Sequence, residues 1–220
     1  MISISNHPRA RALSLALGIF AIALPLCAQD ATALAAKVDA RYNHLHSLSA
    51  TFSQHYTGLG MDRTETGTLL LLKPGRMRWN YDSPAGKLFL LDGRYAWSYT
   101  PGDSQATRCP AKRLDDLRSP LRLLLGHTQL SRELAGLTAQ PLTGGRILLQ
   151  GTPPDQSRIR LVSLTVTPDG QILALRIEES GGVTTTFAFT DLRENIPTTP
   201  ADFTFTPPPG VQLADAPPPL

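Results

Sequence analysis

The sequence predicts a mainly β protein with some helix (α+β), in which a large antiparallel sheet curls towards an incomplete barrel. Apolar and polar residues alternate along several segments, for example where Met77, Trp79 and Tyr81 stand between polar neighbours. This period of two is typical of strands with one buried face. Turn signals that contain glycine separate the segments. A sheet with so many strands does not stay open and flat, so we expect it to curl, with helices across one mouth.

Residues 1–28 are expected to be an export signal. A basic N-terminal region with Arg9 and Arg11 precedes an apolar run from Leu13 to Leu26, and we expect cleavage after Ala28. The run is shorter than the ~18 residues of a membrane-spanning helix, which disfavours an anchor. Lipidation at Cys27 is the other alternative, and the large residue before it fits that poorly. Removing the signal lowers the formal net charge of +3 by two.

The remaining chain is predicted to be one domain over residues 29–212 with a disordered, Pro-rich tail over 213–220. The domain is expected to begin with an amphipathic helix from Asp30 to Leu48. Asp30 is a candidate N-cap because its carboxylate can accept hydrogen bonds from the first turn. Five apolar residues share one face of this helix: Leu34, Val38, Tyr42, Leu45 and Leu48.

Strands follow the helix in both halves of the chain. In the first half we expect strands over 67–72, 76–81 and 94–99, with a hairpin turn at Asp92-Gly93. The second half predicts a meander of three longer strands joined by tight turns: 158–167, 171–179 and 183–191.

The middle of the chain interrupts this pattern. Residues 111–126 carry leucines at helical spacing around Ser119-Pro120, which predicts a short helix, a kink and a further helical turn. Residues 129–137 are predicted to add another short helix. A curled sheet beneath such an insertion can enclose either packed side chains or an apolar cavity.

Enzyme signatures are weak or absent, and we expect neither a cofactor nor a metal. His44 and His46 lie two residues apart on the predicted helix, so they face different sides and cannot chelate one metal. A thiol hydrolase remains an alternative, with Cys109 as nucleophile, His127 as base and Arg108 lowering the pKa of the thiol. No basic run with interleaved aromatic residues indicates a nucleic-acid partner.

Three segments resemble a known family. Leu72 to Tyr81 joins a basic-Pro turn to an aromatic strand, Leu91 to Pro101 holds the Asp-Gly hairpin and a Tyr-x-Pro segment, and Phe203 to Val211 resembles a C-terminal strand and turn. Phe52-Ser53-Gln54 after the first helix also fits. Together these segments resemble the LolA family, periplasmic carriers that take lipoproteins to the outer membrane of Gram-negative bacteria.

The resemblance implies an incomplete antiparallel barrel with a helical lid over an apolar cavity that holds lipoprotein acyl chains. It implies a monomeric periplasmic chaperone, not an enzyme. The implied partners are acylated lipoproteins, the inner-membrane ABC transporter that releases them and an outer-membrane receptor lipoprotein. The alternative is a LolA-like sensor of the envelope state, which binds lipid or lipoprotein without transporting it.

The resemblance also suggests site residues. Met77 and Trp79 match cavity-facing positions, and Lys73 matches an Arg that hydrogen-bonds the lid and holds it closed. Because Lys lacks the planar fork of Arg, we expect a looser latch here. Five further residues are expected to face inward from their strand or helix pattern: Phe52, Leu70, Trp97, Leu121 and Leu124.

Overall fold

A computed structural model describes residues 30–113 and 129–216 of the chain. The first part contains α1 (Ala31–His44), followed by six strands: β1 (Ser47–Gly58), β2 (Met61–Leu72), β3 (Arg76–Ser83), β4 (Leu88–Asp92), β5 (Tyr95–Tyr99) and β6 (Gln105–Pro110). The second part contains α4 (Leu130–Glu133) and six more strands: β7 (Ala135–Pro141), β8 (Ile147–Thr152), β9 (Ile159–Val166), β10 (Ile172–Glu179), β11 (Thr184–Glu194) and β12 (Gln212–Asp215).

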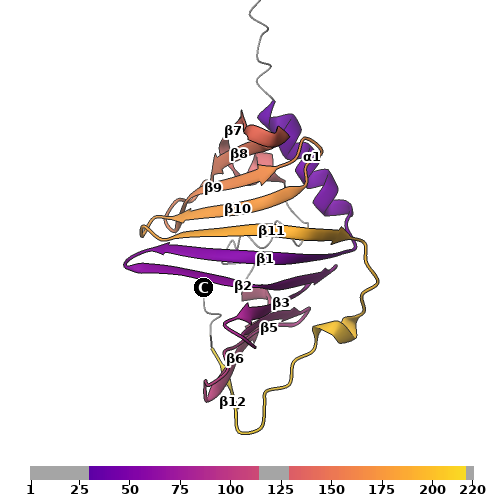
Figure 1. Ribbon diagram of the computed structural model, residues 1–220, viewed down its shortest axis with the longest axis vertical. Helices are drawn as coiled ribbons and strands as arrows, with labels where there is room; N and C mark the ends of the chain where they lie inside the picture. The colour runs from indigo at the N-terminus through magenta and orange to yellow at the C-terminus, as the bar shows by residue number, and fades with distance from the viewer. Residues whose placement is uncertain (1–29, 114–128, 217–220) are drawn as a thin grey trace, which may run out of the picture.

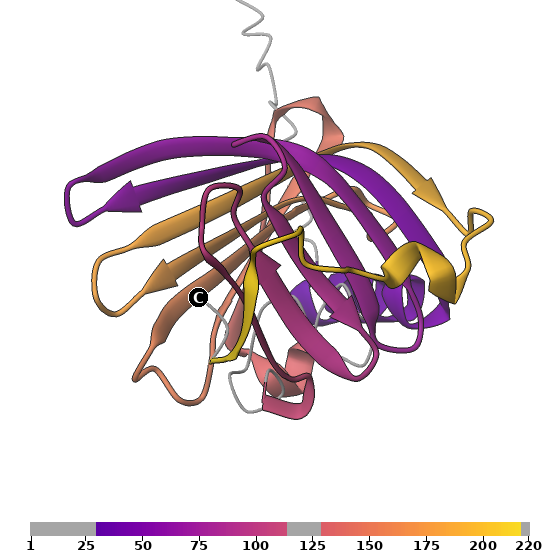
Figure 2. The ribbon, with the colours of Figure 1, turned by 90° about the horizontal axis from the view of Figure 1, so that it is seen from below.

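All twelve strands form one sheet, in the order β12-β6-β5-β4-β3-β2-β1-β11-β10-β9-β8-β7 (Figure 1). Every neighbouring pair is antiparallel except β12 and β6, which are parallel. The edge strands β12 and β7 do not pair with each other, so the sheet curls without closing, as Figure 2 shows from below. The predicted mainly β, incomplete barrel is confirmed.

The N-terminal helix begins where the sequence predicts and ends earlier. The carboxylate of Asp30 caps it by accepting hydrogen bonds from the N–H groups of Thr32 and Ala33, at 2.8 and 3.3 Å. The prediction that the helix extends to Leu48 is wrong, because the chain is extended from Leu45 onwards and enters β1. Leu48 is still buried, now as a strand residue.

Alternation along the strands gives the sheet two faces with different coverings. We call the face that α1 packs against the inner face. Leu34, Val38 and Tyr42 of the helix are buried there with the main core of the protein. The prediction of alternating burial in β3 is confirmed, since Met77, Trp79 and Tyr81 belong to this core while the residues between them are only partly buried.

The C-terminal segment covers part of the opposite, outer face. A 3-10 turn, Pro200–Phe203, places Phe203 against Leu88 and Leu90 of β4. Arg78 holds this segment by donating to the carbonyl oxygens of Asp202 and Thr204, at 3.2 and 2.9 Å.

This arrangement corrects two expectations. The strand expected within Phe203 to Val211 is absent, because Phe203 ends the 3-10 turn and the next strand, β12, begins only at Gln212. The expected tail also starts too early, because Ala214 and Asp215 belong to β12, which pairs with β6.

Several predicted features fall on residues 1–29 and 114–128, outside the described part of the chain. These are the export signal, most of the central insertion with Leu121 and Leu124, and His127. The predicted helix over 129–137 is only four residues long, because the chain enters β7 at Ala135. Among the described residues, no helix has both the length and the apolar character needed to cross a membrane.

Candidate functional site

The centre of the inner face is an apolar floor built from three strands. It consists of Phe52 from β1, Met77 and Trp79 from β3, and Phe187 and Phe189 from β11, all buried. β1 lies between β2 and β11, and Phe52 is directly opposite Phe189 in the register. The pleat therefore gathers these side chains on one face. Sequence analysis placed three of the five here: Phe52, Met77 and Trp79.

Trp79 lies at the middle of the apolar floor. Its ring centroid is 4.6 Å from that of Phe52, in an edge-on arrangement, and 5.3 Å from that of Phe187. The indole is 2% exposed. Among the described residues its Nε1–H is the buried side-chain polar group without a hydrogen-bond partner. A buried donor without an acceptor is unfavourable by about 1–3 kcal/mol, so this position is unusual in an otherwise apolar site.

A polar rim follows the apolar floor on the same face, at the end of the strands away from α1. It consists of Gln54, Tyr56, Glu65, Tyr81 and Lys87. The hydroxyl of Tyr81 donates to Gln54 Oε1 at 3.0 Å, and the Gln54 amide donates to the Tyr56 hydroxyl. Burial raises the pKa of both tyrosines. Lys87 donates to Glu65 at 2.6 Å, and its Nζ lies 4.4 Å from the centre of the Tyr81 ring.

The inner face is therefore graded from apolar to charged. Along β3 the exposed fraction rises from 0% at Met77 through 2% at Trp79 to 9% at Tyr81. Glu65, only 5% exposed, is neutralised by its ion pair with Lys87. Such a surface can accommodate an amphipathic molecule, with its apolar part on the floor and its polar part at the rim.

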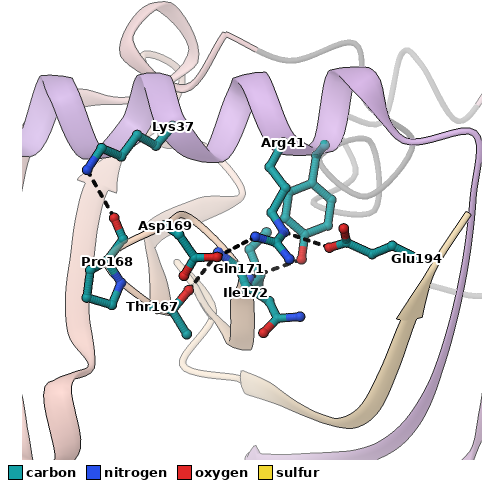
Figure 3. Close-up of polar contacts among 9 residues, drawn as sticks. Lys37, Arg41, Thr167, Pro168, Asp169, Gln171, Ile172 and Glu194 are labelled. Carbon is teal, nitrogen blue, oxygen red and sulfur yellow. Dashed lines mark hydrogen bonds and ion pairs between the residues drawn. The ribbon is translucent and has the colours of Figure 1, made fainter.

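The helix α1 closes the other end of the sheet through a set of polar contacts with the turn between β9 and β10 (Figure 3). Lys37 donates to the carbonyl of Pro168 at 3.1 Å. Arg41 pairs with Asp169 and with Glu194, both at 2.6 Å. Although burial opposes it, these ion pairs raise the pKa of Arg41, so the guanidinium stays charged.

Beneath these ion pairs lies a buried hydrogen bond. The backbone N–H of Ile172 donates to the hydroxyl of Tyr42 at 3.0 Å, and Tyr42 is fully buried. Gly170 in this turn allows the helix to approach closely, because any side chain there would place a Cβ only 2.8 Å from the backbone of Lys37. The helix is thus held against the sheet by close backbone packing and a buried hydrogen bond as well as by ion pairs.

Lys73, the expected lid latch, binds the C-terminal end of α1. Its Nζ donates to the carbonyl oxygen of Tyr42, and its backbone N–H donates to the carbonyl oxygen of His46 at 2.9 Å. Burial lowers the pKa of its amino group. A hydrogen bond from Lys73 to the central insertion stays a prediction, because residues 114–128 lie outside the described part.

Two expected site residues face the wrong side of the sheet. Leu70 and Trp97 lie on the outer face with the cluster around Phe203, and the small Ala96 takes the inner position in β5. The strand register explains this. Trp97 in β5 is opposite Leu90 in β4, and Leu90 is opposite Arg78 in β3, so all three side chains are on the outer face. The prediction that Leu70 and Trp97 line the inner face is therefore wrong.

Cys109 does not have the environment of a nucleophile. It is 2% exposed on the inner side of β6, and burial raises the pKa of its thiol. The expectation that Arg108 lowers this pKa is wrong, because Arg108 directly precedes Cys109 in β6, so its side chain is on the outer face over Trp97, where it pairs with Asp215 at 2.9 Å. Within 30–113 and 129–216, no three His, Cys, Asp or Glu side chains are placed to hold a metal ion.

A hollow of about 310 Å³ lies on the outer face, across β8 to β11. Its polar side chains already bind one another: Gln150 donates to Ser163 at 2.8 Å, and Arg176 pairs with Glu178 at 3.1 Å. A surface satisfied in this way is poorly suited to an apolar ligand, so the inner face is the better candidate site.

Comparison with known proteins agrees with this geometry. Residues 43–206 match the family described as "Outer membrane lipoprotein carrier protein LolA". A relative from Chromobacterium violaceum, named "Outer-membrane lipoprotein carrier protein", is 29% identical over 193 residues, which cover 88% of this chain and 93% of the relative. A relative of the same name from Proteus mirabilis is 30% identical over 178 residues, covering 80% and 85%.

A solved structure shows the same fold at low sequence identity. An uncharacterized conserved protein from Thermus thermophilus superposes with a TM-score of 0.55 at 14% identity, and the match covers 86% of this chain and 100% of that one.

Sequence reasoning missed the polar rim and two of the five residues of the apolar floor, Phe187 and Phe189. Phe187 and Phe189 stand in an alternating segment, Val183 to Asp191, whose inward face could have been chosen from its aromatic residues. The partnership of Glu65 with Lys87 joins two different hairpins, and no local pattern indicates it.

Proposed function

The chain belongs to the LolA family of outer membrane lipoprotein carrier proteins, and we propose that it binds lipoprotein acyl chains on the apolar floor. In this proposal it carries them through the periplasm from the inner to the outer membrane. The observation that supports it most is the graded inner face, with five buried apolar side chains next to a polar rim. No catalytic step is part of the proposal.

The energetics of the task fit such a surface. Each CH₂ group removed from water is worth about 0.8 kcal/mol, so one chain of about sixteen carbons represents on the order of 10 kcal/mol. A carrier has to offset most of this cost and still release its cargo. Because the apolar floor is already buried, cargo must separate packed side chains to enter, and the energy of that separation opposes binding and favours release.

The proposed partners follow from family membership and chemistry. Acylated lipoproteins are the cargo, an inner-membrane ABC transporter loads them, and an outer-membrane receptor lipoprotein accepts them. In this proposal the transporter supplies the energy for loading. In the central insertion, Leu121 and Leu124 are proposed to complete the covering of the chains.

A binding experiment tests the proposal. The protein should bind a dipalmitoyl lipopeptide saturably and ignore the same peptide without acyl chains. Met77→Glu should weaken this binding at least tenfold, because it places a charge among buried apolar side chains. The matched control is Met61→Glu, since Met61 is 41% exposed in the β1–β2 hairpin. Equal binding of acylated and unacylated peptide by the unchanged protein would refute the proposal.

A further inference from the structure

The unpartnered indole of Trp79 points to a specific polar contact inside the apolar site. Among the described residues, Trp79 Nε1 is buried and donates to nothing. In contrast, the other indole of the chain, that of Trp97, donates to Asp92 Oδ2 at 2.7 Å. Buried indole N–H groups usually find an acceptor, because an unpaired donor in an apolar environment costs free energy.

The surroundings of Trp79 define the chemistry of an acceptor for its indole N–H. The floor around it is made of Phe52, Phe187 and Phe189, whose side chains offer no acceptor oxygen. An acceptor that reaches this place therefore has to arrive on a ligand that is otherwise apolar. A fatty acyl chain joined to glycerol has one such group, the ester carbonyl at the end of its alkyl tail.

The gradient of the inner face fixes the direction of that ligand. Met77 lies on the side of α1, because it is opposite Leu71, which is opposite Leu48 at the start of β1. Tyr81 donates to Gln54 of the polar rim, and Trp79 lies between Met77 and Tyr81 along β3. An acyl ester whose carbonyl lies at Trp79 would direct its alkyl tail over Met77 towards α1. Its glyceryl group would then reach the hydroxyl and amide groups of Tyr81 and Gln54.

We propose that Trp79 Nε1–H donates a hydrogen bond to an acyl ester carbonyl of the bound cargo and so sets the depth and direction of the chain. This inference rests on the proposed function and adds a specificity to it: the site distinguishes acyl esters from plain alkyl chains. The bond forms only in the loaded state, and it offsets part of the energy needed to separate the packed floor.

The test compares two ligands by NMR of the indole groups. The ligands are a dipalmitoyl-glyceryl lipopeptide and its dihexadecyl ether analogue, in which a weakly accepting ether oxygen replaces each ester. Because the chain has two Trp, a ¹⁵N spectrum contains two indole signals, which Trp97→Phe assigns. The ester ligand should move the Trp79 signal downfield, the ether ligand should not, and the Trp97 signal should stay constant.

Affinities give an independent readout. The unchanged protein should bind the ester ligand about three- to tenfold more tightly than the ether ligand, as one net hydrogen bond predicts. Trp79→Phe should reduce this ratio to about one, whatever it does to overall affinity. Phe187→Leu is the matched control, because it alters the apolar floor, keeps the indole and should leave the ratio unchanged.

The outcomes separate this inference from the proposed function. Binding of both ligands without an ester-specific shift of Trp79, or an equal ratio in the unchanged protein and Trp79→Phe, overturns the inference alone. Failure of both ligands to bind the unchanged protein overturns the carrier proposal, and the inference with it.

Discussion

Replacement of Tyr42 by Phe tests how α1 is fixed to the sheet. The substitution removes one oxygen and keeps the ring, so it creates no large cavity. It leaves the buried N–H of Ile172 without the acceptor that it now has at 3.0 Å. An unsatisfied buried donor costs about 1–3 kcal/mol, and we expect the free energy of unfolding at pH 7 to fall by that amount.

The same variant should change the alkaline pH dependence. Burial raises the pKa of Tyr42 to about 12 from its ordinary value of 10.0. A raised pKa in the folded state means that the stabilising contribution is complete below pH 10 and is lost as the pH rises towards 12. At pH 11 the loss is about 1.4 kcal/mol for the unchanged protein, and the Tyr42→Phe variant cannot undergo it because it lacks the hydroxyl. The stability gap between the two proteins should therefore narrow by this amount.

Urea unfolding at pH 7, 9 and 11, followed by circular dichroism, measures both effects. The slope of the free energy against urea should be the same in both proteins. Tyr99→Phe is the matched control, because Tyr99 is half-buried on the outer face and should change stability by less than about 0.5 kcal/mol. Equal stability of Tyr42→Phe and the unchanged protein at pH 7, or a gap that is constant up to pH 11, would refute the reasoning.

Three further predictions concern other parts of the fold. Phe203→Ala should lower the free energy of unfolding by about 3–5 kcal/mol because Phe203 is fully buried, and Phe205→Ala, at a half-buried ring, should cost less; calorimetry checks both. Gly170→Ala should destabilise more than Gly182→Ala in urea unfolding. Both glycines have φ of +86°, and only the first would press a Cβ against α1. Cys109 should react with iodoacetamide at pH 8 far more slowly in the folded protein than in urea, because burial raises the pKa of its thiol. Rapid alkylation of Cys109 in the folded protein would contradict its buried position.

Local patterns were enough to predict the class of the fold and several of its elements. Asp30 is the helix N-cap, and the strands of the meander lie where alternation and turns predict them. Met77 and Trp79, which the family resemblance and not a local pattern assigned inward, lie on the inner face. The N-cap and the strands depend on neighbours in the sequence, which is why they can be read from it.

The errors arise where distant segments decide which way a side chain faces. Trp97 and Ala96 alternate in β5, and period two alone does not say which of them is inside. The C-terminal segment with Phe203 and Phe205 covers the outer face, so the large Trp97 is accommodated there. Leu45 continues the helical spacing of α1 by coincidence, which extended the predicted helix too far.

Transfer of a lipoprotein from a membrane tests the central claim most directly. The protein, added to spheroplasts of a Gram-negative bacterium, should release an acylated lipoprotein into the medium as a stoichiometric complex. It should form no complex with the same lipoprotein carrying Ser in place of its acylated Cys. Met61→Glu should keep this activity and Met77→Glu should lose it. Release of no acylated lipoprotein by the unchanged protein, or equal capture of the unacylated form, would contradict the account.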